Sequence, residues 1–222
     1  METAGNRIAA IGEAVLERLE GVNAARERAL AETRQIIRLS ANAVRAVHRN
    51  EFDLAEELLA EAASLKDALV NHLAGYPSIY WSGYVQDAQK EYAEARITLG
   101  VLSGRGVPDP EALGVEDAVY LNGLGEAAGE FRRHCLDAMR RGDLARAEEI
   151  LGVMDEIYGV LVSVDYPDAV TGGLRRTTDM VRGVLERTRG DLTLALQQQT
   201  LTHALKRAET FIREQAGRGG VA

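Results

Sequence analysis

The chain has 222 residues, of which 46% are hydrophobic and 27% are charged, and its formal net charge at pH 7 is −8. This length suffices for one large hydrophobic core, and no Ser/Gly/Pro-rich spacer divides the chain. The negative charge argues against indiscriminate binding of nucleic acid, although a local basic surface is compatible with it, because affinity for phosphate depends on where arginines cluster.

Cys135 is the only cysteine, which excludes an intrachain disulfide and argues against a cysteine-based metal site within one chain. A reducing, cytoplasmic setting is therefore expected. The first residues lack the basic-then-apolar run of a secretion signal, and no apolar stretch is long enough to span a bilayer. No membrane association is expected from this pattern.

Apolar side chains recur at helical spacing along the chain, which predicts an all-α fold. The predicted helical regions are 7–49 with a candidate break at Gly21, 54–73, 78–102, 115–141, 144–162, 174–190 ending at Gly190, and 192–215. The Gly- and Pro-rich segment 103–110 predicts the clearest loop. We expect a single domain over residues 1–216, followed by a disordered tail over 217–222.

Asp87, Glu91 and Glu94 lie at positions i, i+4 and i+7 of the third predicted helix, so their side chains share one face. Like charges in such a row repel by about 0.2–0.5 kcal/mol per pair on an exposed helix. Solvent, arginines of other helices or a divalent cation would offset that repulsion. A solvated surface is the commoner explanation of an acidic row. This acidic row differs from an ordinary surface row because an aromatic-rich segment, residues 76–84, precedes it.

Two groups of arginines follow helical spacing, and at least one group is expected to face a nucleic acid. They are Arg34, Arg38, Arg45 and Arg49, and Arg132, Arg133, Arg140 and Arg141. Surface solvation, with partner acids such as Glu32, is the alternative. Tyr80, Trp81 and Tyr84 are candidate platforms for stacked bases, with core packing as the alternative.

Three glycines, Gly123, Gly125 and Gly129, lie in the helical region 115–141. Each costs up to about 1 kcal/mol relative to alanine in a helix. We therefore expect this helix to pack closely against another backbone.

The segment Gln89–Ala95 (QKEYAEA) closely resembles the Gln-Glu-Tyr-x-Glu-Ala core of translin-associated factor X (TRAX). The segment 174–193 is similar to the C-terminal block of archaeal members of the translin/TRAX family, and 129–133 and 142–143 fall between the two at the expected places. The resemblance covers most of the chain from Arg26 to Leu205.

This resemblance implies a single-domain bundle of seven helices that assembles into a hollow shell, a homo-octamer, around single-stranded RNA. TRAX-type subunits cut RNA with metal-bound acids, whereas translin-type subunits bind single-stranded RNA or DNA without cutting it. The two TRAX glutamates three residues apart match Glu91 and Glu94. TRAX also carries an Asp and a Glu four residues apart on a later helix. The Glu matches Glu149, but Ala145 occupies the position of the Asp.

Glu91, Glu94 and Glu149 are therefore the expected catalytic residues and metal ligands. The missing acid could be replaced by Asp87, Glu126 or Glu130, although Glu130 could equally pair with a buried arginine. Carboxylates suit Mg²⁺ or Mn²⁺, and the resemblance implies an endoribonuclease that uses one of these metals on single-stranded RNA. Ala145 favours the alternative, a non-catalytic single-strand-binding protein of the translin type. A purely structural helical adaptor is a third possibility, without family support.

Overall fold

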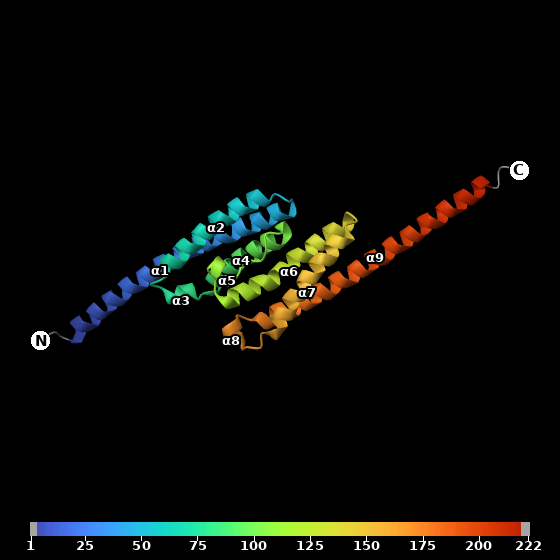
Figure 1. The fold of residues 1–222 in the computed structure, drawn as a ribbon. Coiled ribbons are helices and arrows are strands. Elements are labelled where there is room, and N and C mark those ends of the chain that lie inside the picture. The colour runs from blue at the N-terminus through green and yellow to red at the C-terminus, as the bar shows by residue number, and fades with distance from the viewer. Residues whose placement is uncertain (1–3, 219–222) are drawn as a thin grey trace. The chain divides into compact units, whose positions relative to one another are not determined.

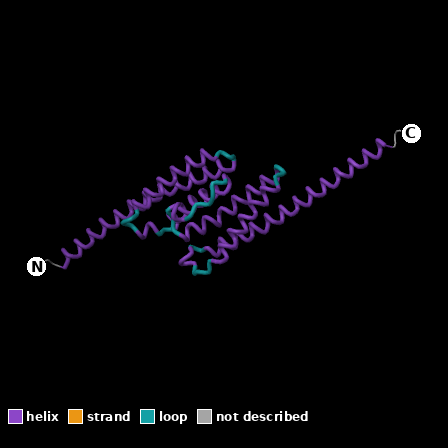
Figure 2. The backbone as a smooth tube through the Cα atoms, in the orientation of Figure 1, coloured by secondary structure: helices purple, strands orange, loops and turns teal. Residues whose placement is uncertain are grey.

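The computed structural model describes residues 4–218, which form six long helices and three single-turn helices without any strand among them (Figures 1 and 2). The all-α prediction is confirmed. Within the same residues, no helix has both the length and the apolar character needed to cross a bilayer. The chain divides into two compact units, which are described separately below. The expectation of a single domain over 1–216 stays a prediction.

The first unit contains the residues up to 127 together with Tyr166–Leu174. Its helices are α1 (Ala4–His48), α2 (Phe52–His72), α3 (Pro77–Tyr80), α4 (Gly83–Ser103), α5 (Pro110–Leu113), the first half of α6 (Asp117–Arg140), and α8 (Asp168–Thr171). The helix α1 packs against α2 and α4, and α2 also contacts α4. Residues without exposed surface fill the core between them, including Ile36 of α1, Leu59 of α2 and Ile97 of α4.

The second unit contains Ala128–Asp165 and the residues from 175 onward. It comprises the second half of α6, α7 (Leu144–Ser163) and nearly all of α9 (Leu174–Arg218). Buried side chains at helical spacing supply its core, among them Phe131 of α6, Met154 of α7 and Val181 of α9. The helix α7 begins at Leu144 as predicted, and Asp143 caps it, because the Asp143 side chain accepts a hydrogen bond of 3.1 Å from the backbone N–H of Arg146.

The candidate break at Gly21 and the helix end predicted at Gly190 are wrong. Gly21 lies within the continuous helix α1, and Gly190 lies within α9. A single glycine weakens a helix by only about 1 kcal/mol, which neighbouring turns can outweigh. A Cβ at Gly21 would lie 3.6 Å from the hydroxyl oxygen of Tyr76, which is an ordinary van der Waals contact, so packing does not require a glycine there.

Two other boundaries differ from the prediction. The region predicted as one helix over 78–102 is divided after Tyr80, because Ser82 takes an extended conformation (φ −70°, ψ 146°) before α4 begins. The predicted disordered tail over 217–222 is wrong for residues 217 and 218, which complete α9. Residues 219–222 of that tail lie outside the described residues.

Tyr80 fixes the segment before α4 by donating a hydrogen bond of 2.9 Å to Glu116. Burial and the neighbouring carboxylate raise the pKa of Tyr80 from its ordinary 10.0 to about 12. The folded state therefore holds this proton more tightly than the unfolded state does. The resulting stability is complete below about pH 10 and is lost as pH rises through 12.

We expect the free energy of unfolding of the unsubstituted protein to fall more steeply between about pH 10 and 12 than that of Tyr80→Phe, which has no phenol to ionise. Urea unfolding at a series of pH values measures both slopes. Equal slopes would contradict a role for Tyr80, because the substitution leaves every other ionisable side chain in place.

Candidate metal centre

Three carboxylates meet between α4 and α6 in the first unit. Glu91 and Glu94 come from α4, Glu126 comes from α6, and one oxygen of each lies within 4.8 Å of the others. All three side chains are half-buried. The sequence predicted the first two and offered Glu126 as one of three candidates for a further acid, so the structure brings that candidate to the predicted pair.

Gly123 explains how α6 approaches α4 closely enough for these acids to meet. A Cβ at Gly123 would lie 3.0 Å from the carbonyl oxygen of Lys90 and 3.1 Å from both the Cβ of Ala93 and the backbone nitrogen of Glu94. Glu126 follows Gly123 by three residues, close to one turn, and so projects from nearly the same face of α6. The predicted close backbone packing is confirmed here. It is wrong for Gly129, where a Cβ would meet nothing within 4 Å.

Lys90 lies against the acidic group and was not singled out in the sequence. Its ammonium donates a hydrogen bond of 2.8 Å to Glu126 and lies 3.6 Å from Asp87. Burial acts to lower the pKa of Lys90, but the hydrogen bond to Glu126 and the charges of Glu126, Asp87 and Glu91 outweigh burial and raise the pKa. Lys90 is therefore a cation at neutral pH and offsets part of the repulsion among the acids. The spacing of Asp87 and Lys90 by three residues was the available signal.

The donor set fits a hard divalent cation. Mg²⁺ and Mn²⁺ prefer carboxylate oxygens, and Glu91, Glu94 and Glu126 each offer one such oxygen within the span of a single ion's ligands. The group contains no His or Cys, so it does not have the ligands typical of zinc. Because Lys90 contacts one oxygen of Glu126, a bound metal would share or replace that contact.

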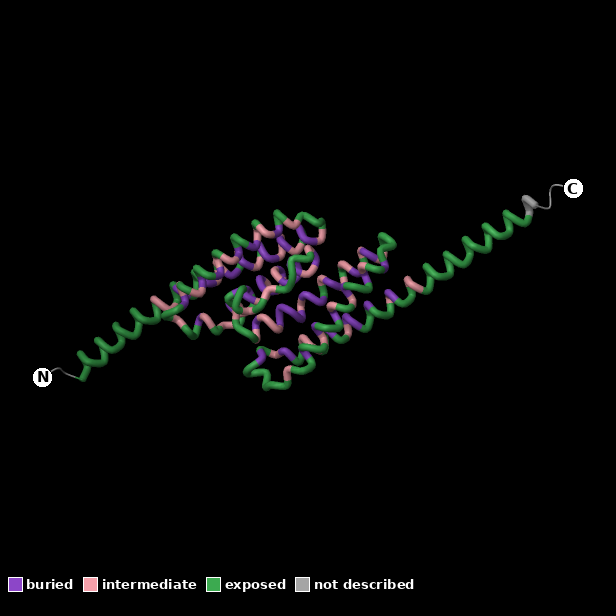
Figure 3. Tube along the Cα trace, viewed as in Figure 1, coloured by how far each residue is buried: buried purple, intermediate pink, exposed green. Residues whose placement is uncertain are grey.

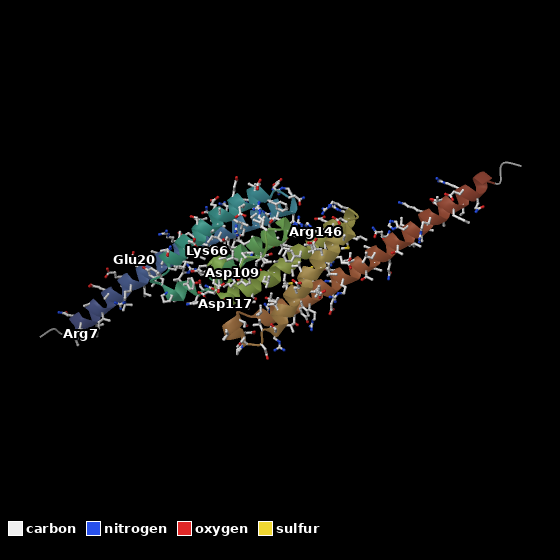
Figure 4. The ribbon with its side chains drawn as sticks, in the orientation of Figure 1. Arg7, Glu20, Lys66, Asp109, Asp117 and Arg146 are labelled. Carbon is white, nitrogen blue, oxygen red and sulfur yellow. The ribbon has the colours of Figure 1, made fainter. Side chains whose placement is uncertain are left out.

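The other acids predicted for the site have different surroundings. The Asp87 side chain is 65% exposed and lies outside the three-acid group. Glu149 belongs to the second unit, where it is 63% exposed and pairs with Arg146 of its own helix at 2.6 Å (Figure 4 labels Arg146). Glu130 also belongs to that unit and is half-buried and engaged in an interaction. The roles predicted for Glu130 and Glu149 stay predictions.

The four arginines of the first predicted row, here called the α1 row, are Arg34, Arg38 and Arg45 of α1 and Arg49 in the turn after it, and all four are exposed. Arg49 pairs with Glu51 at 2.6 Å, and Arg45 donates to the side chain of Asn42 at 2.6 Å. These contacts are local and leave the guanidinium groups at the surface. The row is therefore accessible to a polyanion.

The second predicted group is less uniform. Arg132 is half-buried in the second unit, where it pairs with Asp191 at 2.8 Å and donates to Thr188 at 3.0 Å, so it braces α6 against α9. Arg133, Arg140 and Arg141 are exposed. An open pocket of about 670 Å³ in the same unit is lined by Arg132 and by two arginines of the segment 174–193, Arg187 and Arg189.

The three aromatic candidates for base stacking also differ. Trp81 is 60% exposed, and its ring meets the ring of Tyr80 edge-to-face with 4.8 Å between centroids. The hydroxyl of Tyr84 is buried, without a hydrogen-bond partner among the described residues. Trp81 is thus the accessible platform of the three, whereas Tyr84 fits the core-packing alternative.

Known proteins resemble this chain in sequence and in structure. No protein-family model matches the chain. The uncharacterized protein MJ0175 of Methanocaldococcus jannaschii is 32% identical over 193 residues, which are 86% of this chain and 85% of that protein. Two solved structures, AfC3PO and an AfC3PO–duplex RNA complex, are each 34% identical to this chain, with a TM-score of 0.78. Each comparison covers 85% of this chain, together with 98% of the AfC3PO chain and 97% of the chain in the RNA complex. The structure of apo-NeC3PO, at 21% identity, TM-score 0.75 and coverage of 82% and 96%, has the same fold.

Proposed function

This chain belongs to the translin/TRAX family, and from that premise we propose that it binds RNA and cleaves it with the help of a divalent metal ion. The observation that carries the proposal is the meeting of Glu91, Glu94 and Glu126 within 4.8 Å. RNA as the ligand is supported by the AfC3PO–duplex RNA complex, a structure 34% identical to this chain.

Hydrolysis of a phosphodiester requires that the charge developing on the phosphoryl oxygens be stabilised and that a water become nucleophilic. A bound Mg²⁺ or Mn²⁺ supplies both effects. In this chain Glu91, Glu94 and Glu126 would hold the ion, and Lys90 orients the Glu126 carboxylate. Glu149 is included as a proposed catalytic residue on the family resemblance.

The competing function is RNA binding without cleavage, as in translin-type subunits. Ala145 favours it, because the resemblance implies an aspartate at this position. The same resemblance supports single-stranded RNA as the substrate. However, the solved AfC3PO complex contains duplex RNA, so both forms must be compared directly.

The test is incubation of the purified protein with end-labelled RNA, as a single strand and as a duplex of the same sequence, in Mg²⁺, in Mn²⁺ and in chelator. We expect metal-dependent cleavage of the single strand and none in chelator. Tight binding without cleavage under every condition would establish the non-catalytic alternative. Faster cleavage of the duplex would contradict the single-strand preference.

The arginine groups predict how RNA binding depends on salt. Each phosphate contact contributes about 0.7 to the slope of log affinity against log salt for a single strand. We expect two variants to reduce that slope. One carries Gln at all four exposed positions of the α1 row, and the other carries Gln in place of Arg133, Arg140 and Arg141. Arg132 is left unchanged because it pairs with Asp191. Filter binding at several salt concentrations measures both variants, and each serves as the control for the other. Unchanged slopes in both would contradict the predicted interface.

We further propose a homo-octameric hollow shell with the acidic site inside, following the family. Enclosure would favour flexible single strands over stiff duplex. Light scattering of the purified protein at low concentration gives the mass. A stable monomer that still cuts RNA would contradict the enclosed site while leaving the nuclease proposal standing.

A further inference from the structure

Lys90 is a cation that lies against the three-acid group of Glu91, Glu94 and Glu126. Its ammonium donates a hydrogen bond of 2.8 Å to Glu126, and both side chains are half-buried. The same ammonium lies 3.6 Å from Asp87, which is exposed, whereas α4 is otherwise buried or half-buried from Val85 to Ser103 (Figure 3). Lys90 therefore lies between a half-buried acid and an acid at the protein surface.

A divalent metal ion at the three-acid group would compete with Lys90 for one carboxylate. One oxygen of each acid lies within 4.8 Å of the others, so an ion held by all three would take an oxygen of Glu126. Two cations at one carboxylate repel each other, and the repulsion is stronger in a half-buried site than in water. While its ammonium stays at Glu126, Lys90 therefore opposes metal binding.

Asp87 provides a second partner for the displaced ammonium. Its carboxylate is already 3.6 Å from the Lys90 nitrogen, and its side chain is 65% exposed. The lysine stem is flexible, with rotatable bonds along four carbons. The ammonium can therefore turn from Glu126 towards the surface and still lie near an acid.

The charges of the site indicate what the displaced ammonium would do. Three carboxylates and one divalent ion together leave one net negative charge, which repels the phosphodiester of RNA. The charge of Lys90 cancels it, so the loaded site is neutral. Lysine also binds phosphate directly, through charge-assisted hydrogen bonds. Lys90 thus has the charge and the position to bind the phosphate beside the metal.

We propose that Lys90 is a resident counter-ion that a divalent metal displaces from Glu126, and that the released ammonium then binds a phosphate of the RNA. The inference rests on the proposed function, because it takes the three-acid group as the metal site. It gives Lys90 two effects of opposite sign, since Lys90 weakens metal binding and strengthens RNA binding. A lysine that only held Glu126 in place would strengthen both.

Calorimetric titration with Mn²⁺ in the absence of RNA tests the first effect. Lys90→Gln removes the competing charge and should bind Mn²⁺ at least ~10-fold more tightly than the unsubstituted protein. Lys90→Arg keeps the charge and should bind Mn²⁺ like the unsubstituted protein. The matched control is Arg26→Gln, which removes a positive charge from an exposed position of α1 and should leave the affinity unchanged. Equal or weaker Mn²⁺ binding by Lys90→Gln would overturn the proposal.

Cleavage kinetics on a labelled single strand test the second effect, with Mn²⁺ at a concentration that saturates each protein. The KM of Lys90→Gln for RNA should rise at least ~10-fold, because a charge-assisted hydrogen bond to phosphate is lost. Lys90→Arg should retain most of the RNA affinity. An unchanged KM in Lys90→Gln would overturn the phosphate contact.

Two further measurements separate this inference from the proposed function. Thermal unfolding in chelator shows whether both variants at position 90 fold. If neither the unsubstituted protein nor Lys90→Gln binds Mn²⁺, the metal site itself is wrong and the inference falls with it. If both bind Mn²⁺ with equal affinity, the metal site stands and the role of Lys90 as a displaced counter-ion is refuted.

Discussion

Glu91→Gln, Glu94→Gln and Glu126→Gln should each lower the rate of RNA cleavage by at least ~100-fold. An amide keeps the size of the side chain but loses the anionic oxygen that a hard cation prefers. Loss of metal-assisted charge stabilisation costs several kcal/mol, and each ~1.4 kcal/mol is a tenfold change in rate. Initial rates on a labelled single strand measure the effect. The same loss is expected for Glu149→Gln.

The matched control is Glu57→Gln, which removes one carboxylate from an exposed position of α2. Its cleavage rate should equal that of the unsubstituted protein. Thermal unfolding and RNA binding should be nearly unchanged in all five proteins, which separates catalysis from folding. Full activity in the four site variants would remove the nuclease assignment from these positions. Activity lost in Glu149→Gln but kept in Glu126→Gln would favour the acids implied by the family over those that meet in the first unit.

Gly123→Ala is expected to damage the site without touching a ligand. The new methyl group would lie 3.0–3.1 Å from three atoms of α4, two of which belong to the backbone. Backbone cannot yield as a flexible side chain can, so α6 must shift away from α4 and carry Glu126 with it. Overpacking of this kind costs about 1–3 kcal/mol. We therefore expect a lower free energy of unfolding together with weaker Mn²⁺ binding.

Gly129→Ala on the same helix is the control for that substitution. Its methyl group meets nothing within 4 Å. The higher helix propensity of alanine should therefore raise stability by up to about 1 kcal/mol. Urea unfolding and calorimetric titration with Mn²⁺ measure both variants. Equal stability and equal Mn²⁺ affinity in the two would show that Gly123 does not set the spacing between α4 and α6.

The sequence predicted those features that depend on spacing within one helix. The all-α fold follows from apolar residues three and four apart, and Glu91 and Glu94 share a face because three residues separate them. The predicted breaks at Gly21 and Gly190 failed because packing and neighbouring turns outweigh one glycine. The helix propensity of single residues does not include the stabilisation by packing and neighbouring turns that lets a helix continue through a glycine.

The choice of Glu126 over Asp87 as the third acid could not be made from the sequence. Asp87 is closer along the chain and shares the acidic row, yet its side chain is 65% exposed. Glu126 reaches the pair through the close approach of α6 at Gly123, which is a tertiary contact. Lys90 was missed for a related reason, since its hydrogen bond to Glu126 joins residues 36 positions apart.

The most direct test of the account is anomalous diffraction from crystals of the protein soaked in Mn²⁺. We predict a manganese peak about 2.0–2.3 Å from one carboxylate oxygen each of Glu91, Glu94 and Glu126, absent from crystals of Glu94→Gln. A peak elsewhere, or none at these acids in crystals of a protein that cuts RNA in Mn²⁺, would contradict the central claim that this group holds the catalytic metal.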